Sequence, residues 1–196
     1  EVDAFHHKYS YNEDNQITRV ETSNNGVIYN DQAKYLYNAT GMLMRTELGD
    51  QIQGIDYLFN GQGWMMGVNS RSLGVNNDLG EDGNSSNSIN SNKNFAKDAF
   101  GYTLGYHKDA YKSINRNHKT DLFSNKDVGF GTSGVGQELF NGNISYTVMS
   151  NYNLAPGATV PEQQQNILNA YRYDQLNRLI VAREGLNANS NLSVDN

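Results

Sequence analysis

Short stretches with aromatic residues at alternating positions recur along this chain, each followed by polar residues and then by apolar ones. Side chains two positions apart point to the same face of a β-strand, so each stretch predicts a strand with an aromatic stripe. The aromatic positions are Tyr9 and Tyr11, Tyr35 and Tyr37, Tyr57 and Phe59, and Tyr171 and Tyr173. An aromatic face needs a neighbour to pack on, which favours a sheet of many strands.

Turn residues follow each aromatic pair at fixed positions. The first is Asn or Asp, whose side chain can bond to the backbone two residues on; three positions later stands Gly or Asn, which tolerates the left-handed conformation. These positions are Asn12 and Asn15, Asn38 and Gly41, Asn60 and Gly63, and Asp174 and Asn177. The apolar residues that come next, at 17–20, 43–46, 64–66 and 179–182, predict return strands. Each stretch is therefore predicted to be a β-hairpin.

A phrase that recurs in this way is the signature of a repeat architecture, in which each unit buries its apolar face only against its neighbours. A degenerate fifth hairpin is expected at residues 139–144, where Asn141-Gly142 stands between apolar residues. Further strands are expected at residues 100–106 and 144–149. Because no long apolar stripe has a helical period, at most one short helix is expected, near residues 161–168.

The phrase resembles the tyrosine-aspartate (YD) repeat of the Rhs family: an aromatic, any residue, Tyr, Asp or Asn, two variable residues, Gly or Asn, then an Arg-Leu-like pair. Asn177-Arg178-Leu179 matches the last element. Residues 53–69, 98–106, 139–144 and 170–179 also resemble successive landmarks of Rhs-repeat proteins from Bacteroidota, in the expected order. Three phrases carry Asn in place of Asp, and Phe59 replaces the second Tyr; both exchanges preserve the turn chemistry and the aromatic bulk.

The resemblance implies an all-β fold in which repeated antiparallel hairpins form a spiralling ribbon, part of a β-shell or cocoon. Such shells enclose a C-terminal toxin or effector until delivery. The chain would then form part of the wall of the shell. It would not be an enzyme and would have no catalytic residue, cofactor or metal. Its partners would be the rest of its own repeat shell and the enclosed effector, with export by the type 9 secretion machinery and a secreted or bacterial cell-surface location. The self-cleaving protease segment of the family carries an Asp-Pro-x-Gly motif. Neither Pro156 nor Pro161 stands in such a motif.

A second interpretation is a surface adhesion or recognition module. A twisted ribbon of this kind would display its aromatic rings and an Asn/Ser-rich loop to a glycan or a neighbouring protein. An enclosed polypeptide that co-purifies with the chain would favour the shell, and binding through the exposed loop would favour adhesion.

Three regions are expected along the chain. Residues 1–73 are expected to form hairpins, and residues 95–196 further strands and the hairpin at 171–182. Residues 74–94 are rich in Asn and Ser, which predicts a long surface loop or mobile insertion. This loop either has no function of its own or contacts a partner. Because the chain starts at Glu1 without a charged and apolar leader, we interpret it as a fragment that lacks its signal peptide.

Composition narrows the function classes. The net charge of −6 and the lack of a Lys/Arg cluster argue against nucleic-acid binding. No apolar run approaches the roughly 20 residues that span a bilayer. The chain has no cysteine, which excludes disulfides and thiolate chemistry. Its 13 tyrosines provide much of the area available for packing.

Several motifs that suggest catalysis or cofactors have simpler interpretations. Residues 129–134 match a dinucleotide fingerprint literally but lead into a hairpin signal, so we interpret them as a flexible glycine loop. His6 and His7 are adjacent and would point to opposite faces of a strand, which does not suit one metal. His107, His118, Asp109 and Ser113 could be drawn as a triad, but no nucleophile elbow accompanies them.

The remaining polar motifs are interpreted as structural or inert. Asp78, Glu81 and Asp82 miss the spacing of a calcium hand and are expected to be solvated charges. Trp64, beside Met65 and Met66, is expected to pack in a core and not to form a ligand platform. The Asn-x-Ser/Thr sequons are not expected to be glycosylated in a bacterium. They stand at Asn38, Asn84, Asn143 and Asn191.

Overall fold

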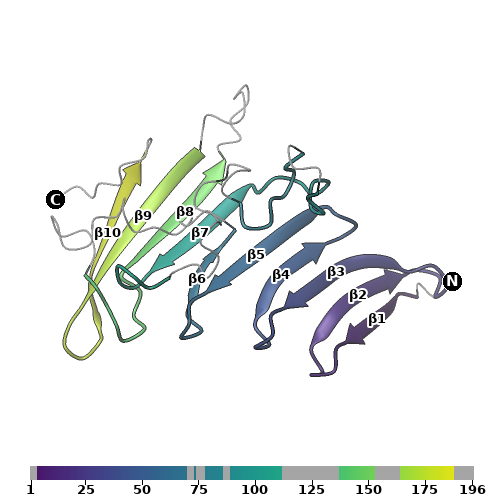
Figure 1. Cartoon of the computed structure of the whole chain (residues 1–196), viewed down its shortest axis with the longest axis horizontal. Coiled ribbons are helices and arrows are strands. Elements are labelled where there is room, and N and C mark those ends of the chain that lie inside the picture. Colours follow the sequence, from purple (N-terminus) through teal and green to yellow (C-terminus); the bar gives the residue numbers. More distant parts are fainter. Residues whose placement is uncertain are drawn as a thin grey trace. The chain divides into compact units, whose positions relative to one another are not determined.

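The computed structural model describes residues 4–69, 73, 78–85, 89–111, 137–152 and 164–187. These ranges contain ten strands and no helix, which confirms the predicted all-β class. The strands are hydrogen-bonded in chain order as an antiparallel meander that is not closed into a barrel (Figure 1). They are β1 (His6–Tyr11), β2 (Ile17–Ser23), β3 (Asn30–Tyr37), β4 (Leu43–Leu48), β5 (Gln53–Phe59), β6 (Met65–Val68), β7 (Phe100–Gly105), β8 (Tyr146–Tyr152), β9 (Gln164–Tyr173) and β10 (Leu179–Asn187).

The four repeated phrases form the predicted hairpins β1–β2, β3–β4, β5–β6 and β9–β10. The return strand is bulged at the same place in three of them, six positions after the Asn or Asp of the turn. The bulged residues are Thr18, Met44 and Ile180, which the pairing skips. The repeats therefore share the register of their strands as well as their turns.

The predicted helix near residues 161–168 is wrong over the part that the structure describes. Residues 164–168 belong to β9, which pairs with β8 on one side and β10 on the other. Leu168 lies opposite Val148 of β8, and both side chains are fully buried. Two hydrogen-bonded ladders and a buried face stabilise this segment more than two helical turns would. Residues 161–163 lie outside the described ranges.

The fifth hairpin expected at residues 139–144 is a turn without flanking strands. Gly142 has a φ of 87°, and Oδ1 of Asn141 accepts a hydrogen bond from the backbone N–H of Asn143 at 3.1 Å. β7 and β8 pair with each other instead. The strand expected at residues 100–106 is confirmed as β7, and the one expected at 144–149 begins at Tyr146.

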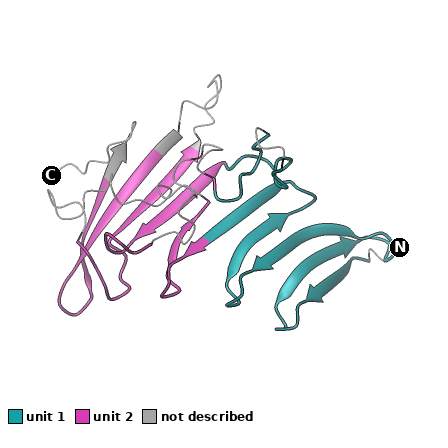
Figure 2. Ribbon diagram, in the orientation of Figure 1, with its two compact units in different colours: residues 1–57, 79–98 teal, residues 58–78, 99–196 magenta. Residues whose placement is uncertain are grey.

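Two compact units divide the chain (Figure 2). Unit 1 consists of residues 1–57 and 79–98, and unit 2 of residues 58–78 and 99–196. The division falls inside β5. The described part of the Asn/Ser-rich region, from residue 79 onward, therefore belongs to the same unit as the first two hairpins.

The interiors of the two units differ in chemistry. Unit 2 buries large apolar side chains such as Tyr146, Val148 and Leu168. The ring of Tyr146 covers Gly105, where a Cβ atom would come within 1.8 Å of a ring carbon, so only glycine fits. Among its described residues, unit 1 buries few large apolar groups, and the residues that are buried are mainly polar. They include Glu21, Ser23, Arg45, Thr46, Asp56 and Asp82.

Candidate functional site

The four repeat turns have the same hydrogen-bond geometry. In each turn, Oδ1 of the leading Asn or Asp accepts hydrogen bonds from the backbone N–H groups two and four residues on, at 2.8–3.0 Å. The residue three positions on is left-handed, with φ between 59° and 80°. The leading residues are Asn12, Asn38, Asn60 and Asp174, and the left-handed residues are Asn15, Gly41, Gly63 and Asn177. The sequence identified both turn positions in all four copies.

Tyrosine hydroxyls connect consecutive hairpins next to these turns. The hydroxyl of Tyr37, the residue before its turn, donates to the carbonyl of Ile17 at 2.9 Å, and that of Tyr173 donates to the carbonyl of Ile144 at 3.0 Å. Tyr106, which follows β7, donates to the carbonyl of Met65 at 2.9 Å. In each case the acceptor is near the start of the preceding return strand. We call these three bonds the tyrosine staples.

Two of the stapled tyrosines, Tyr106 and Tyr173, are weaker acids than a free phenol because they are partly buried. Burial raises the pKa of Tyr106 and of Tyr173 above the ordinary value for a phenol. Both hydroxyls therefore keep the proton with which they donate. The aromatic stripe predicted from the sequence thus has a polar function that ring packing alone does not supply.

The register between successive hairpins is the same at the three staples and at the junction that lacks one. The residue three positions before each stapling tyrosine pairs with the residue two positions after the carbonyl acceptor. The three pairs are Lys34 with Arg19, Thr103 with Gly67, and Ala170 with Tyr146. Asp56, three positions before Phe59, pairs with Arg45 in the equivalent way, although Phe59 has no hydroxyl to donate. One rule therefore describes the junctions between hairpins.

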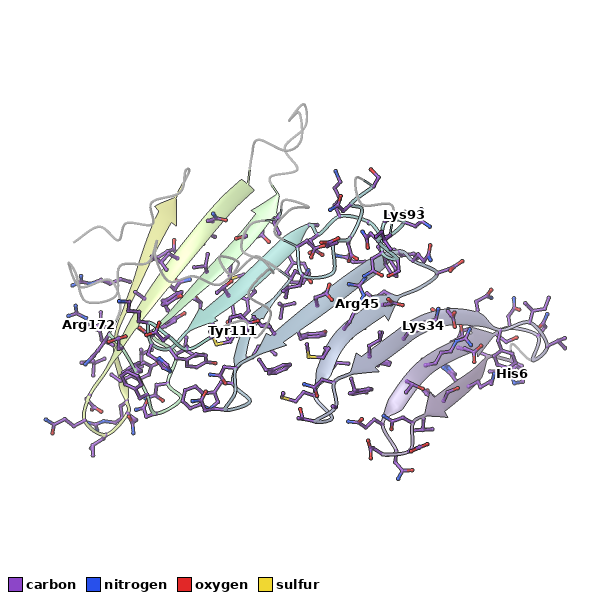
Figure 3. All side chains as sticks on the ribbon, in the orientation of Figure 1. His6, Lys34, Arg45, Lys93, Tyr111 and Arg172 are labelled. Carbon is purple, nitrogen blue, oxygen red and sulfur yellow. The ribbon has the colours of Figure 1, made fainter. Side chains whose placement is uncertain are left out.

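Unit 1 contains a buried arginine cluster that the sequence analysis missed. Arg45 of β4 is labelled in Figure 3. It binds Asp56 of β5 at 2.5 Å, Asp82 at 2.6 Å and Glu47 at 3.2 Å. The ring of Phe95 lies 4.8 Å from the guanidinium carbon. Only 8% of the Arg45 side chain and none of the Asp82 side chain is exposed. Burial lowers the pKa of Arg45, but the charge of Asp56 and the hydrogen bonds that Arg45 donates to Asp82 and Asp56 outweigh it, so the net pKa is raised.

Two glycines make room for this cluster. A Cβ atom on Gly54 would lie 2.0 Å from Nη2 of Arg45, and one on Gly80 would lie 2.2 Å from Nη1. Any larger residue at either position would displace the guanidinium from its carboxylates. A sequence signal for the cluster does exist: the Arg-x-Glu triplets at residues 19–21 and 45–47 both begin seven positions after the Asn of their turns.

The described residues of the segment 79–98, namely 79–85 and 89–98, belong to unit 1, and we call them the strap. Side-chain amides bind its own backbone: Asn90 donates to the carbonyl of Glu81 at 2.6 Å, and Asn92 donates to that of Gly80 at 2.9 Å. Asp82 and Phe95 fix it to Arg45, and the backbone N–H of Ala96 donates to the carbonyl of Ile52 at 3.3 Å. Its Asn content therefore serves hydrogen bonding as well as turns, as in a compact Ω-loop.

The expectation of solvated charges in this region is wrong for Asp82 and for Asp78, because both side chains are buried. Among the described residues, no group of three or more His, Asp or Glu side chains is arranged to hold a metal ion. Within the same ranges, no helical segment has the length and apolar character needed to cross a membrane.

A second set of ion pairs crosses β1–β3 in unit 1. Glu21 binds Lys8 at 2.9 Å and Arg19 at 3.5 Å, and Asp31 binds Arg19 and, at 3.2 Å, Lys34. The hydrogen bond from Arg19 lowers the pKa of Asp31. These pairs connect each strand to the next on the more exposed part of the unit.

The other candidate residues that the structure describes make ring contacts with neighbouring aromatic side chains. His7 stacks on Tyr9 with ring centroids 6.2 Å apart, and His107 stacks on Phe140 at 4.5 Å. Trp64 packs against Tyr106 with ring centroids 5.1 Å apart, but it is half-buried and does not lie in the core as expected. Ser113, His118 and residues 129–134 lie outside the described ranges.

No protein-family model matches this chain, and no curated protein matches it.

Proposed function

We propose that this chain is a structural segment of a repeat shell that encloses and helps deliver a C-terminal toxin or effector, as its resemblance to the Rhs/YD-repeat family implies. The proposal depends on the recurrence of one structural unit. In this unit an Asn or Asp side chain accepts the backbone hydrogen bonds of the turn, the return strand is bulged in three of the four hairpins, and the register to the next hairpin is fixed. A wall made of such units grows by adding hairpins, without a new fold at each step.

The interior chemistry of unit 1 is consistent with a wall. A single-layer sheet leaves both faces of most strands half-exposed, so apolar burial alone stabilises it poorly. Arg45 and its carboxylates supply polar connections between β4, β5 and the strap instead. In this proposal, the described residues hold the wall together and none performs chemistry on a substrate.

A surface adhesion module is the second candidate. Exposed aromatic side chains on and next to β1 favour it, since Phe5, Tyr9 and Tyr11 expose 63%, 49% and 58% of their areas. Aromatic rings of this kind stack on sugars and on partner side chains. In this case the exposed surface, and not an enclosed chain, would carry the function.

The test begins with the native, full-length polypeptide. Gel filtration followed by intact mass measurement and peptide mapping identifies everything that remains bound to it. A non-repeat C-terminal fragment that stays bound, resists protease and becomes sensitive after denaturation supports the shell. A protein that retains nothing and binds glycans or cells through Tyr9 and Tyr11 overturns the shell and supports adhesion.

A further inference from the structure

Within the described residues, β1 and β10 each pair with one neighbour only. The two edges are of different kinds. β1 is the first strand of its hairpin, which we call the outgoing strand and which ends at a repeat turn, whereas β10 is a return strand that begins after such a turn. Every junction between hairpins in the sheet joins a return strand to the next outgoing strand. The edge of β10 is therefore of the type that pairs with the edge of β1. Two β1 edges, or two β10 edges, would not reproduce any junction between hairpins in the sheet.

The tyrosine staples make this match specific. Tyr11 precedes its turn as Tyr37 and Tyr173 precede theirs, yet no hydrogen bond from its hydroxyl is present among the described residues. Leu179 occupies the position of the acceptor Ile17, since each pairs with the residue before its own turn and each precedes the bulged residue. One edge thus carries a staple donor, and the other carries the corresponding acceptor.

The exposed fractions of side chains at the two edges also favour pairing with a further hairpin. Leu179 and Ile180 expose 54% and 61% of their areas, whereas Leu43 and Met44, at the equivalent positions of β4, are half-buried. Tyr11 is likewise exposed where Tyr37 is half-buried. Both edges leave open the positions that a neighbouring hairpin covers inside the sheet, and an uncovered edge of this kind recruits another strand.

We propose that a second copy of this chain adds head to tail, with β10 of one copy pairing antiparallel to β1 of the next. The register rule then places Val181 opposite Lys8, and the hydroxyl of Tyr11 donates to the carbonyl of Leu179. This contact is heterologous, because the two copies contribute different surfaces. It does not require an enclosed effector and so goes beyond the proposed function.

Cysteine cross-linking tests the register directly, because the natural chain has no cysteine. Lys8→Cys and Val181→Cys, prepared separately and mixed under mild oxidation, are expected to form a disulfide-linked pair. The control replaces Val181→Cys with Ala182→Cys, which points to the opposite face of the strand, and cross-linking is expected to be ~10-fold slower. Equal rates for the two mixtures, or faster cross-linking within the Lys8→Cys sample alone, overturn the proposal.

Sedimentation velocity on the intact chain tests the association without cysteines. The average mass is expected to rise with concentration, and Tyr11→Phe is expected to weaken association by ~2–10-fold, the equivalent of one hydrogen bond. Tyr9→Phe, on the same strand, is the control and is expected to leave association unchanged. A chain that stays monomeric at every concentration, or equal effects of the two substitutions, overturns the proposal. Retention of an effector is measured separately, so failure here leaves the shell untouched.

Discussion

Arg45 and Asp82 stand 37 positions apart in the chain and form an ion pair of 2.6 Å that is almost completely buried. This pair fixes the strap to β4 of unit 1. A buried charge that loses its partners is costly, because neither water nor another ion replaces them. The stability of unit 1 should therefore depend on Arg45 more than on any surface charge.

Arg45→Ala is expected to destabilise unit 1 by about 3–5 kcal/mol, since it leaves Asp56 and Asp82 buried without their cation. Urea unfolding followed by amide hydrogen exchange in β4, β5 and the strap measures the effect. The control is Arg178→Ala, which removes an ion pair to Asp174 whose arginine is 73% exposed and should cost at most about 1 kcal/mol. Equal losses for the two variants would show that the Arg45 cluster adds nothing beyond a surface pair.

Two glycines of one turn separate conformational strain from crowding. Gly63 has a φ of 80°, whereas Gly61 has no positive φ, and a Cβ atom at either position would meet no atom within 4 Å. Gly63→Ala should therefore cost about 1–2 kcal/mol through the left-handed backbone alone. Gly61→Ala should be neutral or slightly stabilising, because it restricts the unfolded chain. Denaturant midpoints measure both, and a Gly61→Ala variant as unstable as Gly63→Ala would contradict the role of the turn geometry.

Removal of a staple should have a measurable effect on stability. Tyr37→Phe keeps the ring but deletes the hydroxyl that donates to Ile17, so a loss of about 0.5–1.5 kcal/mol is expected. Tyr35→Phe, two residues earlier on β3, is the matched control because no side-chain hydrogen bond of Tyr35 is present among the described residues. Urea unfolding compares the two. If the Tyr35 variant loses as much stability, ring packing and not the staple explains the tyrosine.

Local chemistry predicted the repeated turns, because Asn12 and its three counterparts each bind backbone groups only two to four residues away. The same local argument failed at residues 164–168, where pairing with β8 and β10 decides the structure. It also missed the Arg45 cluster, since Asp82 comes from a distant segment whose composition suggested only solvated polar residues. Positions that depend on long-range partners were the ones that sequence patterns did not reveal.

The four turns should respond differently to acid, because Asp174 is the only leading residue that can take up a proton. The backbone N–H of Arg178 is the largest cause that lowers the pKa of Asp174. A carboxyl whose pKa is lower in the folded state stabilises that state above the unfolded pKa of about 3.9, and the stabilisation is lost as the pH falls through the folded pKa. As the pH falls below the unfolded pKa, the amides of Leu176 and Arg178 should lose exchange protection, while those of Thr40 and Met42 in the Asn38 turn should keep theirs. Asp174→Asn should abolish the difference. Equal loss of protection in both turns of the natural chain would assign the effect to global unfolding and not to the carboxylate of Asp174.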